Sequence, residues 1–291
     1  MSSVILSTKN LNYLYSKGTS SQIHAIRDIN VQIEKGELVG IIGHTGSGKS
    51  TLIQHFNGLL KGTSGVVELE GKDIWADKSK IRNVRFRVGV CFQYPEYQLF
   101  EETVYKDIAF GPRNMKLSEE EIDSRVRESM RYVGLNESYM EKSPFDLSGG
   151  EKRRVAIAGV MAMKPEVLIL DEPCAGLDPK GRETILKMIT DYREETGSTV
   201  LVVSHSMEDI SKISSKVLVM NDSHLAYYDT VDAVFSHAES LKNMGLNIPQ
   251  LTELFLKLKE KGYDVSTDVY TMEKAESELL KLLKGGDKNA Q

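Results

Sequence analysis

The residues with the most specific chemical pattern are Gly43 to Thr51, which read G-H-T-G-S-G-K-S-T. They follow the apolar run 38–42, which predicts a buried strand, and precede residues 52–58, which predict the start of a helix. This is the phosphate-loop pattern G-x-x-x-x-G-K-S/T in the strand–loop–helix setting that it requires. Its glycines let backbone N–H groups converge on a polyphosphate, while Lys49 offers a positive charge to the β- and γ-phosphates and Ser50 a hydroxyl to Mg²⁺. The pattern predicts a nucleoside triphosphate site, with a chance glycine-rich turn as the alternative.

Polar side chains occur at or just after the ends of three further expected strands. Asp171 and Glu172 follow the first of these strands, His205 follows the second and Gln93 the third. The three strands are 167–170, 199–203 and 87–92. Ligands of open α/β sheets bind at the carboxyl ends of the strands, so we expect these four side chains to share one site with the phosphate loop.

Each of these residues suits a different task. Asp171 is suited to hold Mg²⁺, and the Gln93 amide oxygen can bind Mg²⁺ or water. We expect Glu172 to point away from Asp171, because neighbouring strand residues alternate, and to orient or deprotonate a water near the γ-phosphate. His205 can donate a hydrogen bond to that phosphate. The alternatives are a solvated strand end for the carboxylates and a structural role for the histidine.

The stretch Leu147 to Glu151 reads L-S-G-G-E and predicts a second anion site. Ser148 and Glu151 form a helix-capping pair, which is the structural alternative. Gly149 and Gly150 are poor helix formers, but in a first turn they leave backbone N–H groups bare for an anion. Because the chain already has one phosphate site, this second one points to a nucleotide held by a partner.

The remaining pattern predicts a parallel α/β core with additions. Residues 4–14 and 23–33 alternate as antiparallel strands do, and 65–74 reads as short strands around a turn. Tyr15 ends the first strand, where we expect a plate for a nucleotide base; strand propensity is the alternative. Helices are expected at 103–110, 118–134 (with a capping box of Ser118 and Glu121), 148–163 and 179–195. Two apolar stripes follow: Leu251, Leu254, Phe255 and Leu258, and then Met272, Ala275, Leu279 and Leu283.

Composition limits the function classes. The 291 residues carry a net charge of −5, which disfavours a nucleic-acid surface, and include two cysteines, Cys91 and Cys174, that suit a cytosolic packing role. No apolar run approaches the ~20 residues that a bilayer span needs.

The motifs in their order resemble those of ATP-binding-cassette (ABC) ATPases over about residues 4–230. Gly43–Thr51 resembles the Walker A loop, 167–173 (V-L-I-L-D-E-P) the Walker B strand, and L-S-G-G-E the signature motif. Residues 175–178 resemble the D-loop, His205 the switch histidine and Gln93 the Q-loop glutamine. The resemblance implies a P-loop parallel-sheet core with antiparallel β and helical subdomains, and a head-to-tail dimer in which Ser148 serves the partner's ATP.

Longer stretches resemble the ATPases of energy-coupling factor (ECF) vitamin importers. They include L-I-Q-H-F-N-G after the phosphate loop and F-Q-Y-P-E-Y-Q-L-F-E-E-T, and Thr45 is typical of the second of the two ATPase subunits. The resemblance implies a cassette at 1–235 with a helical subdomain inserted at about 94–163. It also implies a C-terminal helical extension at 236–291 used in ATPase dimerisation, with packing onto the cassette as the alternative.

The same resemblance implies partners and a location. Three partners are implied. One is a second ATPase, which is expected to be a paralogue and not a copy of this chain. The others are a membrane-spanning coupling subunit (T component), which would dock near residues 93–102, and a substrate-binding membrane subunit (S component). The place is the cytoplasmic face of a bacterial membrane, and the cargo is a vitamin or transition-metal ion. A soluble ABC ATPase of DNA repair or translation is the rival, but the chain has one signature and no room for a long coiled coil inside the cassette.

On this resemblance the chain is an ATPase that uses ATP and Mg²⁺. Glu172, His205 and Gln93 are the expected catalytic residues, and Mg²⁺ is expected at Ser50, Gln93 and Asp171. The residues expected to contact ATP are Tyr15, Gly43, His44, Thr45, Gly46, Ser47, Gly48, Lys49, Ser50, Thr51, Ser148, Gly149 and Gly150. Cys174 stands where the family commonly has threonine, which raises the hypothesis of a thiol-sensitive site.

Overall fold

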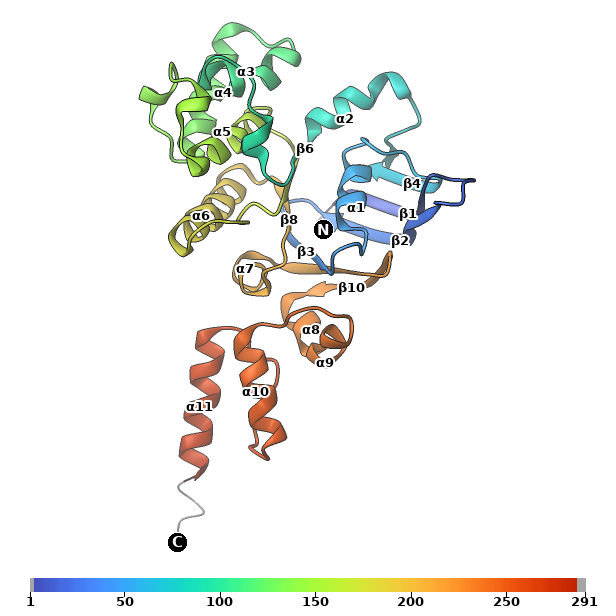
Figure 1. Ribbon diagram of the computed structural model, residues 1–291, viewed down its shortest axis with the longest axis vertical. Helices are drawn as coiled ribbons and strands as arrows, with labels where there is room; N and C mark the ends of the chain where they lie inside the picture. The colour runs from blue at the N-terminus through green and yellow to red at the C-terminus, as the bar shows by residue number, and fades with distance from the viewer. Residues whose placement is uncertain (1–2, 287–291) are drawn as a thin grey trace.

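Two β-sheets form the frame of the computed structural model, which describes residues 3–286 (Figure 1). The first sheet has the strand order β2-β1-β4-β5 and is antiparallel, and the second has the order β10-β9-β3-β8-β7-β6. In the second sheet only β10 runs antiparallel to its neighbour. The strands are β1 (Val4–Tyr15), β2 (Ile23–Glu34), β3 (Leu38–Gly43), β4 (Ser64–Leu69), β5 (Lys72–Asp73), β6 (Val88–Cys91), β7 (Val167–Asp171), β8 (Thr199–Val203), β9 (Lys216–Asn221) and β10 (His224–Thr230). The expected α/β class with an added antiparallel sheet is confirmed.

Helices pack around both sheets and continue beyond them. They are α1 (Lys49–Phe56), α2 (Ile81–Arg87), α3 (Val104–Asn114), α4 (Glu119–Tyr132), α5 (Gly149–Met161), α6 (Pro179–Thr196), α7 (Met207–Ile213), α8 (Val231–Ser236), α9 (Ala238–Asn243), α10 (Gln250–Glu260) and α11 (Met272–Gly286). Helices α3, α4 and α5 lie between β6 and β7 in the chain and form a group to one side of the parallel sheet (Figure 1).

The central strands are apolar throughout because both of their faces are covered. In β7, Leu168 and Leu170 join the core formed with α3 to α6, whereas Val167 and Ile169 join the core formed with α1 and the antiparallel sheet. All four side chains are fully buried. The unbroken run V-L-I-L is therefore what a parallel strand between two layers requires.

Two of the helix starts had predicted capping boxes, and only one box is complete. Ser148 accepts the N–H of Glu151 and the Glu151 carboxylate accepts the N–H of Ser148, as expected. Ser118 likewise accepts the N–H of Glu121, but the Glu121 carboxylate turns to Arg125 at 2.6 Å. An arginine one turn further along the helix competes successfully for that carboxylate.

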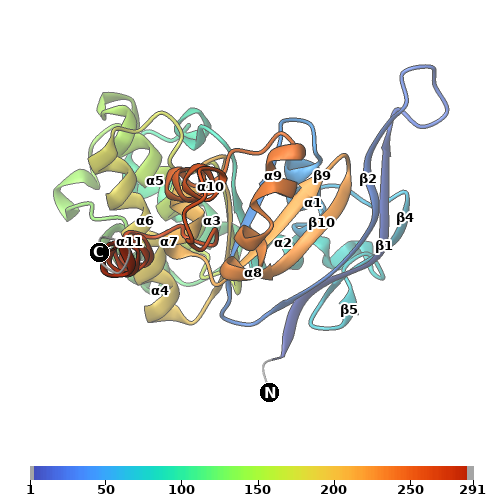
Figure 2. The same cartoon turned by 90° about the horizontal axis from the view of Figure 1, so that it is seen from below.

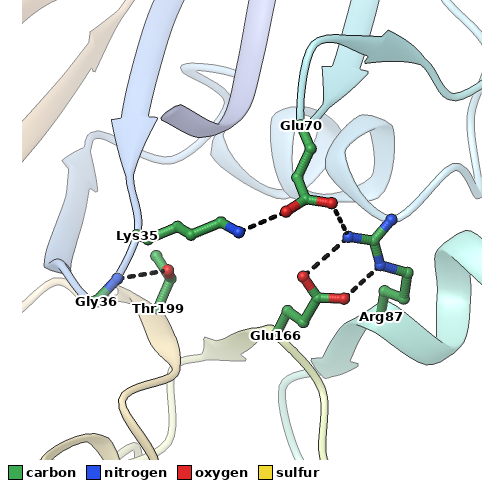
Figure 3. A network of polar contacts seen from close by, with 6 residues as sticks. All are labelled: Lys35, Gly36, Glu70, Arg87, Glu166 and Thr199. Carbon is green, nitrogen blue, oxygen red and sulfur yellow. Dashed lines mark hydrogen bonds and ion pairs between the residues drawn. The ribbon is translucent and has the colours of Figure 1, made fainter. Parts of the chain in front are cut away.

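A charged network joins the two sheets at the edge where the central parallel strands begin (Figure 3). Lys35, in the turn between β2 and β3, pairs with Glu70 at the end of β4, and Glu70 also pairs with Arg87. Arg87 in turn donates to Glu166, just before β7, through Nη2 at 2.8 Å. Four charges of alternating sign thus tie the antiparallel sheet to the parallel one.

Helices α10 and α11 lie side by side and extend away from the sheets (Figures 1 and 2). Phe255 and Ala275 are buried with Val265 and Val269 in a small core of their own. The predicted stripes are only partly covered, since exposed apolar side chains remain on both helices: Leu254, Met272, Leu279, Leu280 and Leu283. The division into a cassette at 1–235 and an extension at 236–291 stays a prediction, and residues 287–291 lie outside the described part.

Several short elements had no signal in the sequence pattern. Helices α2 and α7 have seven residues each, too few to show an apolar period. Strand β10 forms by pairing with β9, and its tyrosines are half-buried rather than alternating between core and solvent.

Candidate functional site

A cavity of about 410 Å³ opens where the phosphate loop meets the ends of the parallel strands. It lies at the carboxyl ends of β3, β6, β7 and β8, which share one edge because these strands are parallel. The structure therefore brings together the four strand-end residues, Tyr15 and most of the phosphate loop, whereas Gly43, His44 and Ser47 are not among the residues that line the cavity. The lining residues are Tyr15, Ile23, His24, Ala25, Thr45, Gly46, Gly48, Lys49, Ser50, Thr51, Gln93, Asp171, Glu172, Val203 and His205.

At two glycines of the phosphate loop, a side chain would collide with the neighbouring backbone. A Cβ at Gly43 would lie 2.5 Å from the carbonyl oxygen of Met220, and one at Gly48 would lie 2.4 Å from that of Ala25. Gly48 also has a φ of +105° and precedes α1 without a side-chain cap. The first N–H groups of α1 therefore have no side-chain acceptor at the cavity, which is the arrangement that suits an anion.

Lys49 holds its ammonium group inside this loop. The residue is 6% exposed, and Nζ donates to the carbonyl oxygens of Gly43 at 2.7 Å and His44 at 3.0 Å. Burial lowers the pKa of Lys49, while the carboxylates of Glu172 and Asp171 act in the opposite direction. The cavity therefore contains both positive and negative groups: the Lys49 ammonium and the carboxylates of Asp171 and Glu172.

Ser50 and Asp171 face each other across the cavity floor. Ser50 Oγ donates to Asp171 Oδ2 at 3.4 Å, and Asp171 is 7% exposed. Burial raises the pKa of Asp171, opposed by the Ser50 hydrogen bond and by Lys49. A hydroxyl and a carboxylate oxygen at this separation are a donor pair that fits Mg²⁺, which prefers oxygen ligands. Gln93 is exposed on the cavity wall.

Glu172 enters the same cavity by a different route from the one predicted. Alternation along a strand was expected to turn it away from Asp171, but β7 ends at Asp171. Glu172 instead has a φ of +52°, and its N–H donates to the Val203 carbonyl at 2.9 Å. The left-handed conformation, rather than strand alternation, directs its side chain, and both carboxylates line the cavity.

The Glu172 carboxylate lacks a hydrogen bond at one oxygen. Oε1 is buried and lies 3.2 Å from Nε2 of His205, without hydrogen-bond geometry. Burial, and then the charge of Asp171, raise the pKa of Glu172 to about 7. Burial and the charge of Lys49 lower the pKa of His205. A buried carboxylate with a pKa near neutrality is suited to exchange a proton with water.

The signature residues lie elsewhere on the chain. Ser148, Gly149 and Gly150 are exposed at the start of α5, and none of them lines the 410 Å³ cavity. Ser148 and Gly150 line a separate hollow of about 260 Å³ with Asp178 and Lys180, among others. Within one chain, the two predicted anion sites do not meet.

Tyr15 is 36% exposed at the cavity rim, and its hydroxyl lies 3.2 Å from Thr51 Oγ1. Tyr13 packs edge-on against it, with ring centroids 4.8 Å apart. The sequence pattern missed the contribution of β2, whose first residues Ile23 to Ala25 line the same cavity. Their only signal was the start of an alternating strand, which does not reveal which loop it faces.

Cys174 stands where the family commonly has threonine, and its surroundings do not support the hypothesis of a thiol-sensitive site. It is 8% exposed, and burial raises the pKa of its thiol to about 12. The reactive form of cysteine is the thiolate, so the structure argues against a thiol-sensitive site. The packing role fits both cysteines, since Cys91 is also buried and burial raises its pKa to about 12.

The sequence profile of the ABC transporter family matches residues 26–175, which include the phosphate loop, Gln93, the signature motif and both carboxylates. The chain belongs to the ABC transporter ATPases. It binds ATP, and its activity as an enzyme is ATP hydrolysis.

Relatives narrow the family further. The chain is 54% identical to the energy-coupling factor transporter ATP-binding protein EcfA2 of Clostridium acetobutylicum, over 94% of this chain and 96% of the relative. It is 50% identical to the protein of the same name from Caldanaerobacter subterraneus, over 96% and 98% of the two chains. These matches place the chain in the ECF transporter ATP-binding family and favour the transport function over the DNA-repair or translation alternative.

Two solved structures agree with this assignment. CbiO1 of Clostridium perfringens, described as part of the ABC transporter complex CbiONQ, superposes with a TM-score of 0.74 at 40% identity, covering 87% of this chain and 98% of that one. The ATP-binding cassette MJ0796, in a dimeric post-hydrolysis state bound to ADP and Pi, gives a TM-score of 0.70 at 29% identity, over 78% and 99%. None of the helices between residues 3 and 286 combines the length and apolarity that a bilayer span requires.

Proposed function

We propose that this chain is one of two ATPase subunits that drive an ECF-type importer, and that it hydrolyses MgATP only when paired with a second cassette. The observation that carries the proposal is the separation of the two anion sites. Lys49, Asp171 and Glu172 line the phosphate-loop cavity, whereas the signature residues Ser148 and Gly150 line a separate hollow. A head-to-tail pair would bring the signature residues of each subunit to the cavity of the other.

The cavity residues divide into those that hold the nucleotide and those that act on it. The backbone of residues 43–51 and Lys49 would hold the phosphates, and Tyr15 would stack on the base. Ser50, Asp171 and Gln93 would hold Mg²⁺, which supplies charge neutralisation at the β- and γ-phosphates. The oxygen donors of Ser50 and Asp171, 3.4 Å apart, fit this ion.

Glu172 would orient the attacking water and accept its proton. The buried carboxylate has a pKa of about 7 and one oxygen without a hydrogen bond, so it can take up a proton near neutral pH. His205, whose pKa is lowered by burial and by Lys49, would be neutral at that pH and donate to the γ-phosphate. Lys49 would exchange its bonds to the loop carbonyls for bonds to phosphate oxygens.

The second cassette would contribute Ser148, Gly149 and Gly150. In α5 the Ser148 side chain caps its own helix, and the exposed glycines leave space in front of the first turn, where an added Cβ would meet nothing within 4 Å. This open helix start suits the phosphates of a nucleotide held by the partner. Thr45 favours a paralogue over a second copy of this chain.

A membrane subunit would dock in a groove beside the helical group. The groove encloses about 440 Å³ and is lined by Leu99, Phe100 and Phe110 together with Arg82 and Arg85 of α2, among others. Phe100 and Phe110 are 57% and 47% exposed, and their rings pack edge-on at 4.9 Å. An exposed aromatic pair in a groove is typical of a docking site for a helix. Part of the predicted docking segment 93–102, including Leu99 and Phe100, lines this groove.

Helices α10 and α11 would take part in ATPase pairing. Met272 and Leu283 are each 70% exposed, and Leu254 and Leu280 are each 46% exposed. Apolar side chains on a projecting helix pair favour contact with an equivalent extension on the second ATPase. The assembly would sit at the cytoplasmic face of a bacterial membrane, with a T component and an S component that selects a vitamin or transition-metal ion.

Affinity purification of the chain from its native membranes, followed by mass spectrometry, tests the proposal. We expect a second, similar cassette and a multi-span membrane protein in stoichiometric amounts, and the small membrane proteins that accompany them would identify the cargo. Recovery of the chain alone, or with ribosomes or DNA-repair proteins, would contradict the importer function while leaving the ATPase assignment in place.

A further inference from the structure

Arg153 is a buried arginine on α5 whose guanidinium contacts two other segments of the chain. Its side chain is 5% exposed. Nη2 and Nε donate to the two carboxylate oxygens of Glu96 at 2.9 and 3.2 Å. Nη1 donates to the carbonyl oxygens of Ala175 at 2.6 Å and Pro173 at 3.2 Å. One side chain therefore joins α5, the segment after Gln93 and the segment after Glu172.

The two carbonyls belong to the turn that carries Glu172. Pro173 follows Glu172 directly, and the N–H of Ala175 donates to the Glu172 carbonyl at 3.1 Å. Glu172 itself has a φ of +52°, a conformation that a residue other than glycine keeps only when its surroundings hold it in place. The bonds from Arg153 are part of those surroundings.

Glu96 lies in the short turn Pro95–Gln98, which runs from Gln93 in the cavity wall to Leu99 and Phe100 in the groove. The carboxylate is largely buried, with 15% of the side chain exposed. Burial raises the pKa of Glu96, but the hydrogen bonds and charge of Arg153, together with a bond from the backbone N–H of Glu96 itself, lower it below its usual range. Glu96 therefore stays ionised and balances the buried guanidinium.

We propose that Arg153 is a positioning residue for Glu172, and that Glu96 fixes Arg153 in turn. The guanidinium is planar and presents its donors in a fixed geometry. Nε and Nη2 can therefore bind the Glu96 carboxylate while Nη1 donates to the carbonyls of Pro173 and Ala175. Lysine keeps the charge but cannot make these bonds together. A displacement of the turn 95–98 would then shift the turn that holds Glu172, which links the groove to the hydrolysis step. This role concerns hydrolysis and holds whichever partner occupies the groove.

Arg153→Lys in the full-length chain, assayed in its ATP-hydrolysing assembly, tests the role. Because a misplacement of about 1 Å at a catalytic group can cost on the order of a hundredfold, we expect kcat to fall by about that factor. The KM for ATP should change by less than about threefold, since the phosphate-loop contacts remain.

Arg125→Lys is the matched control. Arg125 also joins a carboxylate, that of Glu121 at 2.6 Å, to a backbone carbonyl, that of Met163 at 3.2 Å, and its side chain is 15% exposed. It contacts neither Glu96 nor the Glu172 turn, so its kcat should stay within about twofold of the unchanged protein. Equal losses of kcat in the two variants, or a loss explained by weaker ATP binding, would overturn the role.

A double variant separates positioning from general support of the fold. If Arg153 acts through Glu172, adding Arg153→Lys to Glu172→Gln should lower single-turnover hydrolysis by less than about twofold further. Independent, multiplicative losses would contradict the proposal. Should Arg153→Lys fail to fold, Glu96→Gln keeps the shape of the side chain and removes its charge; we then expect kcat to fall by about tenfold at an unchanged KM, and an unchanged kcat would overturn the role.

Discussion

The carboxylate of Glu172 lies 3.2 Å from the imidazole Nε2 of His205, although the two residues follow different strands. Strands β7 and β8 are parallel neighbours, so the residues that follow them emerge at the same edge of the sheet. The backbone N–H of Glu172 donates to the carbonyl oxygen of Val203, the last residue of β8. This bond holds Glu172 close to the segment that carries His205. An acid with a raised pKa and a histidine with a lowered pKa therefore face each other beside Lys49.

Glu172→Gln should bind ATP with nearly unchanged affinity and lose most of its turnover. Glutamine keeps the shape of the side chain but cannot accept a proton from water, and loss of such a group typically costs 10²–10⁴-fold. We expect kcat to fall within that range and an ATP-bound dimer to accumulate. Steady-state hydrolysis and sedimentation in the presence of ATP measure the two effects. Normal turnover in this variant would show that another group takes the proton.

Turnover should depend on pH through Glu172. A general base works only when ionised, and the pKa of Glu172 is about 7, so kcat at saturating MgATP should rise as pH increases through about 7 and level off above it. A profile that is flat from about pH 6 to about pH 8 would argue against Glu172 as the base. The residual turnover of Glu172→Gln should lack this rise.

Lys49→Ala should abolish tight nucleotide binding. The substitution removes a buried cation that lies inside the phosphate loop and bonds to Gly43 and His44. Charge-assisted bonds to phosphate are worth about 1.5–3 kcal/mol, so we expect the Kd for ATP to rise by roughly 10–100-fold. Equilibrium binding of a fluorescent ATP analogue measures this. Lys9→Ala, which removes an exposed lysine paired with Glu68, is the control and should bind ATP as before.

Glu70→Gln should weaken the link between the two sheets, and the effect should depend on pH (Figure 3). Bonds from Lys35 and Arg87 lower the pKa of Glu70 to about 2, below its value in the unfolded chain. The stabilisation is therefore present above about pH 4.5 and is lost as pH falls towards 2.

Since the Glu70 side chain is 38% exposed, the loss at pH 7 should be only about 0.5–1 kcal/mol in the free energy of unfolding. Urea unfolding at pH 7 and at low pH measures it. Glu102→Gln, which removes an exposed partner of Lys106, is the control and should change stability less. An equal loss at both pH values for Glu70→Gln would mean that the ion pairs are not its cause.

A maleimide should leave ATP hydrolysis unchanged during brief treatment near pH 7. Cys174 is 8% exposed and its thiol has a pKa of about 12, so almost none of it is thiolate at that pH. Mass spectrometry of the treated protein reports modification directly. Rapid labelling of Cys174 together with inactivation that ATP prevents would restore the thiol-sensitive hypothesis.

The sequence by itself was sufficient to predict those parts of the site that depend only on residues near one another in the chain. The spacing of Gly43, Gly48 and Lys49 specifies a loop that few other sequences can form, because side chains would collide with neighbouring carbonyls. The apolar run before Asp171 indicated a parallel strand covered on both faces. Because the carboxyl ends of parallel strands share one edge of the sheet, it also indicated that Gln93 and His205 would lie near Asp171.

Tertiary structure decided what depends on long-range contacts. The direction of Glu172 follows from a left-handed turn held by Val203, which no local pattern encodes. The triple contact of Arg153 joins residues far apart in the chain, and the exposed side of α10 and α11 depends on which apolar residues find partners. The physical reason is that side-chain periodicity and loop motifs are fixed by neighbours along the chain. Burial, pKa shifts and bonds between segments exist only once the sheets and helices have packed.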